Sequence, residues 1–147
     1  VQTEDFDAGA EIARLHASDS SVGAVATFVG VCRDRNDGAA VATMTLEHYP
    51  GMTEKALSNI EAEARARWPL DDVLIIHRHG RMLPGEDIVL VLTSSSHREA
   101  AFAACQFLMD WLKTKAPFWK LEEGAAGSSW VEAKAGDDAA ARRWTKA

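Results

Sequence analysis

The hydrophobic pattern along the chain changes repeatedly between the period of a strand and the period of a helix. Runs of β-branched and apolar residues, or strict alternation with polar ones, predict strands. Apolar residues that recur every three or four positions predict helices. The expected strands are Val22–Val31, Val41–Tyr49, Asp72–His79, Glu86–Ser94, Phe118–Glu122 and Ser129–Ala133. The expected helices are Phe6–Ala17, Thr53–Trp68, Ser96–Lys113 and Asp137–Trp144.

Turn-forming residues separate these elements. Pro69 follows a helical pattern and is expected to end it. The link GRMLPGE, which begins at Gly80, is expected to close a hairpin between the strands on either side. The polar segment Arg33–Ala40 contains an Asp-Gly pair and is expected to be a mobile loop. No repeat or domain boundary interrupts the pattern, which favours a single α+β domain, residues 1–147, over a regularly alternating α/β chain.

One helix start carries a specific signal. Ser96 and Glu99 form the S-x-x-E pattern of a capping box. His97 and Arg98 then fall in the first turn, where the helix dipole makes each cation unfavourable by about 0.3–1 kcal/mol. Either these side chains contact an anionic ligand, or they point into solvent or onto a neighbouring carboxylate. The residues alone leave both explanations open.

Composition and charge exclude several classes of protein. The net charge of −6 argues against broad binding to nucleic acid, so any anion site must be local. The longest apolar runs are far too short to span a bilayer, and the start VQTEDFDAG lacks the features of a signal peptide. Cys32 and Cys105 are far apart, with no C-x-x-C pattern that would suggest a disulfide framework. A cytoplasmic location is therefore expected.

Positive charge nevertheless gathers in LKTKAPFWKLEE, Leu112–Glu123. Lys113 and Lys115 fall at a helix C-terminus, where complementing the dipole is a sufficient structural role. Lys120 differs, because it follows a proline and two aromatic residues on an extended segment. A lysine in a partly desolvated pocket keeps its charge only with an anionic partner. The segment is therefore either a solvated helix end or part of an anion-binding pocket.

Three further side-chain groups are candidates for chemistry. Arg33 adds a cation after a strand, although Asp34 and Asp37 nearby are possible partners. Cys32 is either a persulfide-carrying nucleophile, activated by the neighbouring cation, or a buried inert thiol. His77 and His79 share a strand face, as two metal ligands would, but no residue at diagnostic spacing completes a site. No metal site is predicted, and the chain has no P-loop, G-x-G-x-x-G, G-x-S-x-G or H-E-x-x-H motif.

Four segments together resemble the MoaE family, the large catalytic subunits of molybdopterin synthase. They are LEHYPGMTEKAL (Leu46–Leu57), HRHGRMLPGE (His77–Glu86), SSSHREAAFAACQFLMDWLKTKAPFWK (Ser94–Lys120) and WVEAK (Trp130–Lys134). The resemblance extends in register from Gly23 to Trp144 and is long enough to be specific. It implies the family's α/β-hammerhead fold, which agrees with the α+β pattern.

The resemblance also implies a reaction and its partners. A sulfurtransferase of this family converts cyclic pyranopterin monophosphate to molybdopterin during molybdenum cofactor biosynthesis. The sulfur comes from the C-terminal thiocarboxylate of a small ubiquitin-like subunit. The implied assembly is a heterotetramer, with a homodimer of large subunits and one small subunit at each end. No cofactor, metal, nucleic acid or membrane is implied.

The family's site residues can be carried over to matching positions of this sequence. Lys113 and Lys120 correspond to the catalytic pair. The implied substrate-binding positions are Phe28, Val31, Cys32, Arg33, His97, Arg98, Lys120, Leu121, Glu122 and Lys134. Lys134 stands where relatives carry arginine, which keeps the charge but loses bidentate recognition of phosphate. Two alternatives remain: a Cys32 persulfide sulfurtransferase, and a non-catalytic adaptor that binds a ubiquitin-like tail.

Overall fold

The computed structural model describes residues 1–36, 38–124, 127–131 and 135–145. Every helix and strand predicted from the hydrophobic pattern is present, with its ends shifted by a few residues. The helices are α1 (Ala8–His16), α2 (Met52–Arg67), α3 (Arg98–Lys115) and α4 (Ala135–Arg142). The strands are β1 (Ala24–Val31), β2 (Arg35–Asn36), β3 (Ala39–Ala40), β4 (Thr43–His48), β5 (Asp72–His77), β6 (Gly80–Met82), β7 (Asp87–Ser95), β8 (Phe118–Gly124) and β9 (Gly127–Val131).

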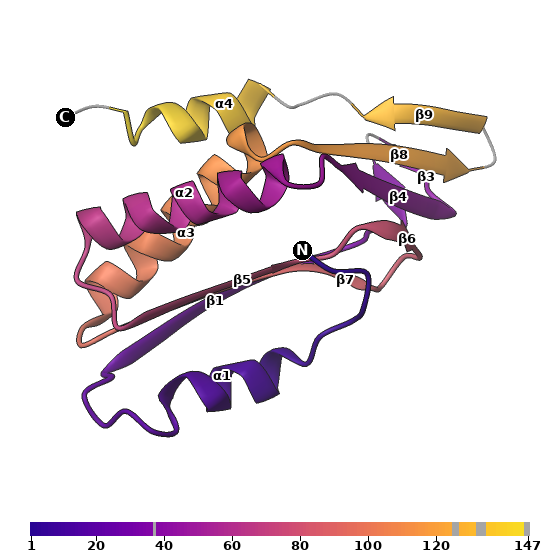
Figure 1. Cartoon of the computed structure of the whole chain (residues 1–147). Coiled ribbons are helices and arrows are strands. Elements are labelled where there is room, and N and C mark those ends of the chain that lie inside the picture. Colours follow the sequence, from indigo (N-terminus) through magenta and orange to yellow (C-terminus); the bar gives the residue numbers. More distant parts are fainter. Residues whose placement is uncertain (37, 125–126, 132–134, 146–147) are drawn as a thin grey trace.

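The strands form two antiparallel sheets and one short hairpin. The first sheet has the order β1-β7-β5, and the second has the order β6-β4-β8-β9. In Figure 1 the second sheet lies beyond one end of the first, and β3 lies at the end of β8 that carries Glu123. Antiparallel sheets with helices packed on them define an α+β fold, as the sequence predicted.

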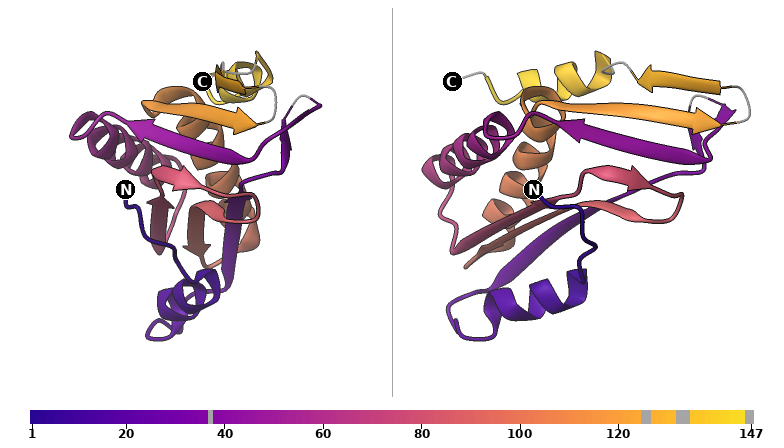
Figure 2. Two further views of the ribbon diagram at one scale, coloured as in Figure 1. Left: turned by 90° about the vertical axis from the view of Figure 1, so that its right-hand side faces the viewer. Right: turned by 45° about the vertical axis from the view of Figure 1, so that its right-hand side comes forward.

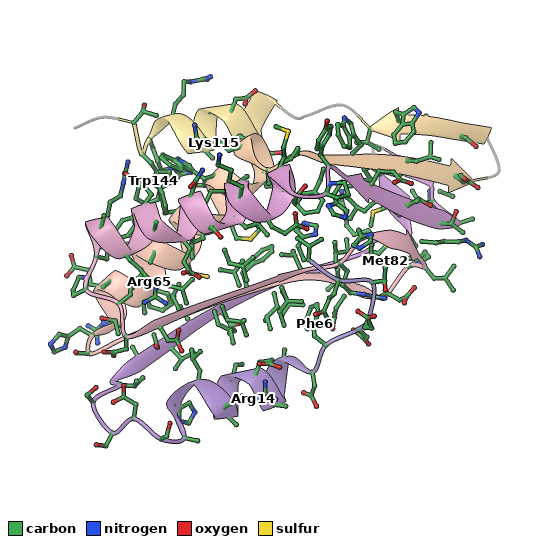
Figure 3. The ribbon with its side chains drawn as sticks, viewed as in Figure 1. Phe6, Arg14, Arg65, Met82, Lys115 and Trp144 are labelled. Atoms are coloured by element: carbon green, nitrogen blue, oxygen red, sulfur yellow. The ribbon has the colours of Figure 1, made fainter. Side chains whose placement is uncertain are left out.

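The main core lies between the first sheet and two helices. Helices α2 and α3 cover one face of the sheet and α1 covers the other, as both views in Figure 2 show. Phe6 lies between α1 and the sheet (Figure 3). Alternate residues of β1, β5 and β7 meet apolar residues of α2 and α3; the buried members include Ala26, Val73, Val89, Val91, Leu57, Ile60, Ala104, Phe107 and Leu108.

A second, smaller core lies where the two sheets approach. Cys32, Met44, Leu46 and Met82 are buried together, with Phe118 packed against them. Met82, which ends β6 in the second sheet, is fully buried (Figure 3). These residues come from the end of β1, from β4 and from β6, so this cluster fixes the second sheet against the first. No described helix is long and apolar enough to cross a membrane.

The link predicted as a simple turn contains a strand. β5 and β7 do pair as a hairpin, with Asp72 opposite Ser94 and His77 opposite Val89. The connection between them, however, leaves the first sheet and forms β6. Met82 pairs there with Met44 of β4, which explains why three residues of a turn-rich segment are extended. The predicted hairpin is therefore confirmed, but the strand within its link was missed because β6 is too short to show a period.

The predicted loop Arg33–Ala40 also contains regular structure. β2 and β3 form a two-residue hairpin in which Arg35 lies opposite Ala40. The loop interpretation was therefore wrong for these residues, while the mobility of the segment stays a prediction. Asp37 lies outside the described residues. The polar composition of the segment gave no sign that it contains two paired strands.

The capping box predicted at Ser96 is not formed. The N-cap residue of α3 is His97, which makes no side-chain capping hydrogen bond. β7 continues to Ser95, which pairs with Ala24, and Ser96 and His97 form a bend before the first helical residue, Arg98. At the start of α2, by contrast, one of the two hydrogen bonds typical of a capping box does form: the Gly51 N–H donates to Glu54 Oε2 at 2.6 Å.

Candidate active site

An open pocket of about 300 Å³ lies at the end of β1, between the β2–β3 hairpin and β8. Five of the site residues implied by the resemblance line it; they are Val31, Cys32, Arg33, Lys120 and Glu122. Arg35 and Asn36 of the hairpin line it as well. These five residues come from two segments that are far apart in the sequence but meet at this pocket, as the resemblance implied.

Local geometry at the end of β1 builds one wall. The register between β1 and β7 shifts between Gly30 and Val31, which forms a β-bulge. A Cβ atom at Gly30 would lie only 2.6 Å from Val89 Cγ1, so any larger residue there would force the buried Val89 side chain to move. After the bulge, the Cys32 N–H donates to the Glu86 carbonyl at 2.8 Å, and the Cys32 carbonyl accepts from Gly85 N–H at 2.7 Å. These bonds fix the backbone that carries Arg33.

Strand β8 builds the opposite wall through its alternation. Lys120 lies opposite Leu46 and Glu122 opposite Met44, so both side chains share the face that turns toward the second core. Leu121 must point to the other face, where its neighbours across the strands are Thr45 and Trp130. The side chain of Leu121 is therefore not brought into the pocket, although its backbone lies between two residues that line it.

Cys32 is buried in the pocket wall, with only 3% of its surface exposed. Burial raises the pKa of its thiol, the charge of Lys120 opposes this, and Glu122 and Glu86 add to it. The net direction is upward, so the thiol is protonated at neutral pH and is a weak nucleophile. This environment supports the inert-thiol interpretation over the persulfide one.

Two hydrogen bonds join the hairpin to the charged groups of the pocket. Asn36 Nδ2 donates to Glu122 Oε1 at 2.6 Å. Arg33 Nη2 donates to Asn36 Oδ1 at 3.4 Å, a longer contact. Asn36 was not predicted as a site residue, because a single asparagine in a polar segment is an ordinary turn residue.

Lys113 lies near the end of α3 and does not line this pocket. It is close to His77, since its positive charge is one reason, after burial, that the pKa of His77 is lowered to about 4. The His77 ring stacks on Phe118, with 3.8 Å between ring centroids. Phe118 begins β8, the strand that carries Lys120. The His77–Phe118 stack therefore connects the region around Lys113 with the region around Lys120. Lys115 lies over the Trp111 ring at 4.7 Å, which gives it a structural role (Figure 3).

The remaining predicted residues are not gathered at this pocket within one chain. His97 and Arg98 are exposed beyond Ser95, at the opposite end of β7 from Asp87, which pairs with Val31. The two ends of β7 are about 27 Å apart at the usual rise of a strand. Phe28 lies between them on β1, and 39% of its surface is exposed. Lys134 lies outside the described residues.

The histidine pair considered as a metal site has other contacts. His77 Nδ1 lies 2.8 Å from the Arg78 carbonyl, and the His79 ring lies 4.4 Å from the His48 ring. Within the described ranges, no three His, Cys, Asp or Glu residues are placed to hold a metal ion.

The pocket therefore combines Arg33, Arg35 and Lys120 with one carboxylate, Glu122, in a protein whose net charge is negative. Such an excess of cations in a partly enclosed space favours an anionic ligand. The chain belongs to the MoaE protein family, whose model matches residues 1–115. This confirms the resemblance found in the sequence.

Individual relatives agree over nearly the whole chain. A relative from Pseudomonas aeruginosa, named molybdopterin synthase catalytic subunit, is 58% identical and covers 98% of this chain and 96% of its own length. A solved molybdopterin biosynthesis MoaE protein from Burkholderia ambifaria is 56% identical, with a TM-score of 0.83 over 99% of this chain and 96% of that one. The Staphylococcus aureus molybdopterin synthase structure is 31% identical, with a TM-score of 0.80 over 88% and 93%.

Proposed function

We propose that this chain is the catalytic subunit of a molybdopterin synthase. In this role it transfers sulfur to cyclic pyranopterin monophosphate, and the sulfur comes from the thiocarboxylate of a small ubiquitin-like subunit. The observation that carries the proposal is the pocket in which Arg33 and Lys120 converge, on a chain whose relatives bear that name. The word subunit in those names supports a partner chain, here proposed to be the small sulfur donor.

The chemistry explains the excess of cations. A thiocarboxylate and a phosphorylated substrate are both anionic, so their encounter is repulsive unless fixed positive groups offset it. We assign Lys120 and Lys113 to the reacting end, where negative charge that develops on oxygen needs a donor or a proton. Arg33 is assigned to the substrate phosphate, which provides binding energy remote from the reacting carbons.

A second copy of the chain would complete the site. His97 and Arg98 cannot reach the pocket of their own chain, because they follow the end of β7 that lies about 27 Å from the end paired with Val31. In the homodimer that the resemblance implies, the helix start of one copy is free to meet the pocket of the other. We therefore propose that His97 and Arg98 act across the dimer, together with the exposed Phe28.

The donor's tail is proposed to enter beside β8. Phe118 and Lys120 occupy one face of that strand, and Lys113 lies near its start. A C-terminal Gly-Gly segment is narrow enough to enter such a groove, because it has no side chains to exclude. The cytoplasmic location and the single domain expected from the sequence stay predictions.

The decisive experiment supplies both substrates. The purified chain is mixed with thiocarboxylated small subunit and cyclic pyranopterin monophosphate, and the dithiolene product is sought by mass spectrometry. A small subunit that ends in an ordinary carboxylate is the matched control and yields no product. Product formed by the chain with free sulfide and no donor subunit would contradict delivery by the tail. A complex that binds the donor but never forms product would favour the adaptor alternative.

A further inference from the structure

We infer that Asn36 is a positioning residue, which holds the Glu122 carboxylate away from Lys120 and so keeps the lysine available to an anion. The inference rests on the proposed function of the pocket and assigns a part in it to a residue of the β2–β3 hairpin. Asn36 and Glu122 are 86 positions apart in the sequence, and the hydrogen bond of 2.6 Å between them is partly buried.

Glu122 needs such a partner because of where β8 places it. Lys120 and Glu122 are two residues apart on one face of a strand, so their Cα atoms are about 7 Å apart. Both side chains line the same pocket and are long enough to meet. Nevertheless, the ion pairs formed among the described residues do not include one between Lys120 and Glu122. The carboxylate is directed instead toward the hairpin, where Asn36 donates to it.

The amide of asparagine suits this position for a chemical reason. Its Nδ2 donates to the anionic Glu122, while its Oδ1 faces the cationic Arg33 at 3.4 Å. An amide has both a donor and an acceptor and no charge of its own. It therefore satisfies both neighbours without neutralising either, whereas aspartate would repel Glu122 and lysine would pair with it.

The hairpin is fastened to β8 independently of this side chain. The Ala42 N–H donates to the Glu123 carbonyl at 2.7 Å, and the Val41 N–H donates to the Asp34 carbonyl at 2.8 Å. A Cβ atom at Gly124 would lie 2.3 Å from the Ala40 carbonyl oxygen, so the two backbones are in close contact. Replacing Asn36 should therefore release the Glu122 carboxylate without detaching the hairpin.

The test compares Asn36→Ala in two backgrounds. In the wild-type chain, the freed Glu122 pairs with Lys120, and kcat/KM for sulfur transfer from the thiocarboxylated small subunit should fall by about tenfold. Glutamine cannot neutralise a lysine, so in a Glu122→Gln background the same change should cost less than about twofold. Asn59→Ala, at the other asparagine of the chain and exposed on α2, is the control and should leave kcat/KM unchanged.

Two outcomes would overturn the inference. One is an Asn36→Ala variant that turns over like the wild type. The other is an equal loss in both backgrounds, which would mean that Asn36 does not act through Glu122. A merely structural role would also reduce activity in both backgrounds, so the comparison separates positioning from stability.

A thermal-unfolding cycle tests the contact without using the proposed reaction. Asn36→Ala and Glu122→Ala remove the two partners of one hydrogen bond, so the double variant should melt no lower than the less stable single variant. Additive melting shifts would show that the bond does not form and would overturn the inference. If the wild type fails to transfer sulfur while the shifts are non-additive, the proposed function fails but the contact stands.

Discussion

The side chains of the pocket divide into those that act through charge and those that pack. Arg33, Arg35 and Lys120 line it as cations, while Cys32 is buried in its wall with a raised thiol pKa. The resemblance identified Arg33, Cys32 and Lys120 by their matching positions in the family, although only Lys120 stands in one of the four quoted segments. Asn36 escaped prediction, since its role depends on a contact with a strand 86 positions away that no local pattern records.

The lysine pair gives the first prediction. Lys113→Ala and Lys120→Ala should each reduce sulfur transfer by at least about 10²-fold, the scale of losing one fixed charge or general acid. Arginine at either position should restore activity only where the lysine acts as a fixed charge, because guanidinium does not release its proton. Lys55→Ala, at an exposed position of α2, is the control. Circular dichroism checks that each variant is folded. Alanine variants that turn over normally would mean that the cluster is only a solvated surface.

The second prediction concerns the thiol. Cys32→Ser should retain most of the sulfur-transfer activity, because burial keeps the thiol protonated and the donor subunit supplies the sulfur. The measurement is turnover with thiocarboxylated donor, after a melting experiment has confirmed the fold. Cys105→Ser is a matched control, since burial in α3 raises the pKa of that thiol to about 11. A loss of several orders of magnitude for Cys32→Ser alone would support the persulfide alternative.

At the scale of elements, the packing of the second sheet against the first determines where the site residues lie. β5 ends in His77, whose ring stacks on Phe118 at the start of β8. The hydrophobic period predicted both strands but could not show that they belong to different sheets, because strand partners are chosen by packing between distant segments. The short strands β2, β3 and β6 were missed for a related reason: two or three residues are too few to show alternation.

The buried histidine between the two sheets, His77, gives a prediction about the pH dependence of stability. The pKa of His77 is about 4 in the folded chain, chiefly because of burial, against an ordinary value of 6.5. The unfolded chain therefore binds the proton first, and the free energy of unfolding should fall as pH drops from about 6.5 to about 4. Because the unfolded chain binds one more proton than the folded chain over this interval, the free energy of unfolding should decrease by about 3 kcal/mol.

The variant for this test is His77→Asn, which keeps a donor for the Arg78 carbonyl but cannot titrate. Urea unfolding at several pH values should show a shallower decline for this variant than for the wild type. His16→Asn, at an exposed position of α1, serves as the control and should follow the wild-type profile. Parallel profiles for the wild type and His77→Asn would exclude His77 as the source of the pH dependence.

At the scale of the whole molecule, one chain carries two separated parts of the implied site. The pocket lies at the Val31 end of β1, whereas His97 and Arg98 follow the opposite end of β7. The sequence motifs gave both parts but not their separation, because a motif states which residues are used and not which copy supplies them. The length of α3 and the antiparallel register of the first sheet reveal the separation. The dimer proposed above would bring the two parts together.

Mixed dimers test this arrangement. Arg98→Ala and Lys120→Ala chains, each impaired alone, are unfolded together and refolded in equal amounts. If Arg98 serves the pocket of the partner, each mixed dimer contains one intact site. Half of the dimers are mixed, and each mixed dimer has one intact site and one defective site. About one quarter of wild-type activity should therefore return. If each site used residues of a single chain, no activity would return.

The pair Lys113→Ala and Lys120→Ala is the matched control for this experiment. Both lysines are assigned to the same copy of the site, so their mixed dimer has one pocket without Lys113 and another without Lys120. Mixing these two variants should therefore restore nothing. Recovery in the first mixture but not in the second would place the helix start of one copy against the pocket of the other. Recovery in both would mean that the two lysines serve different pockets, and the assignment of a catalytic pair to one chain would be wrong.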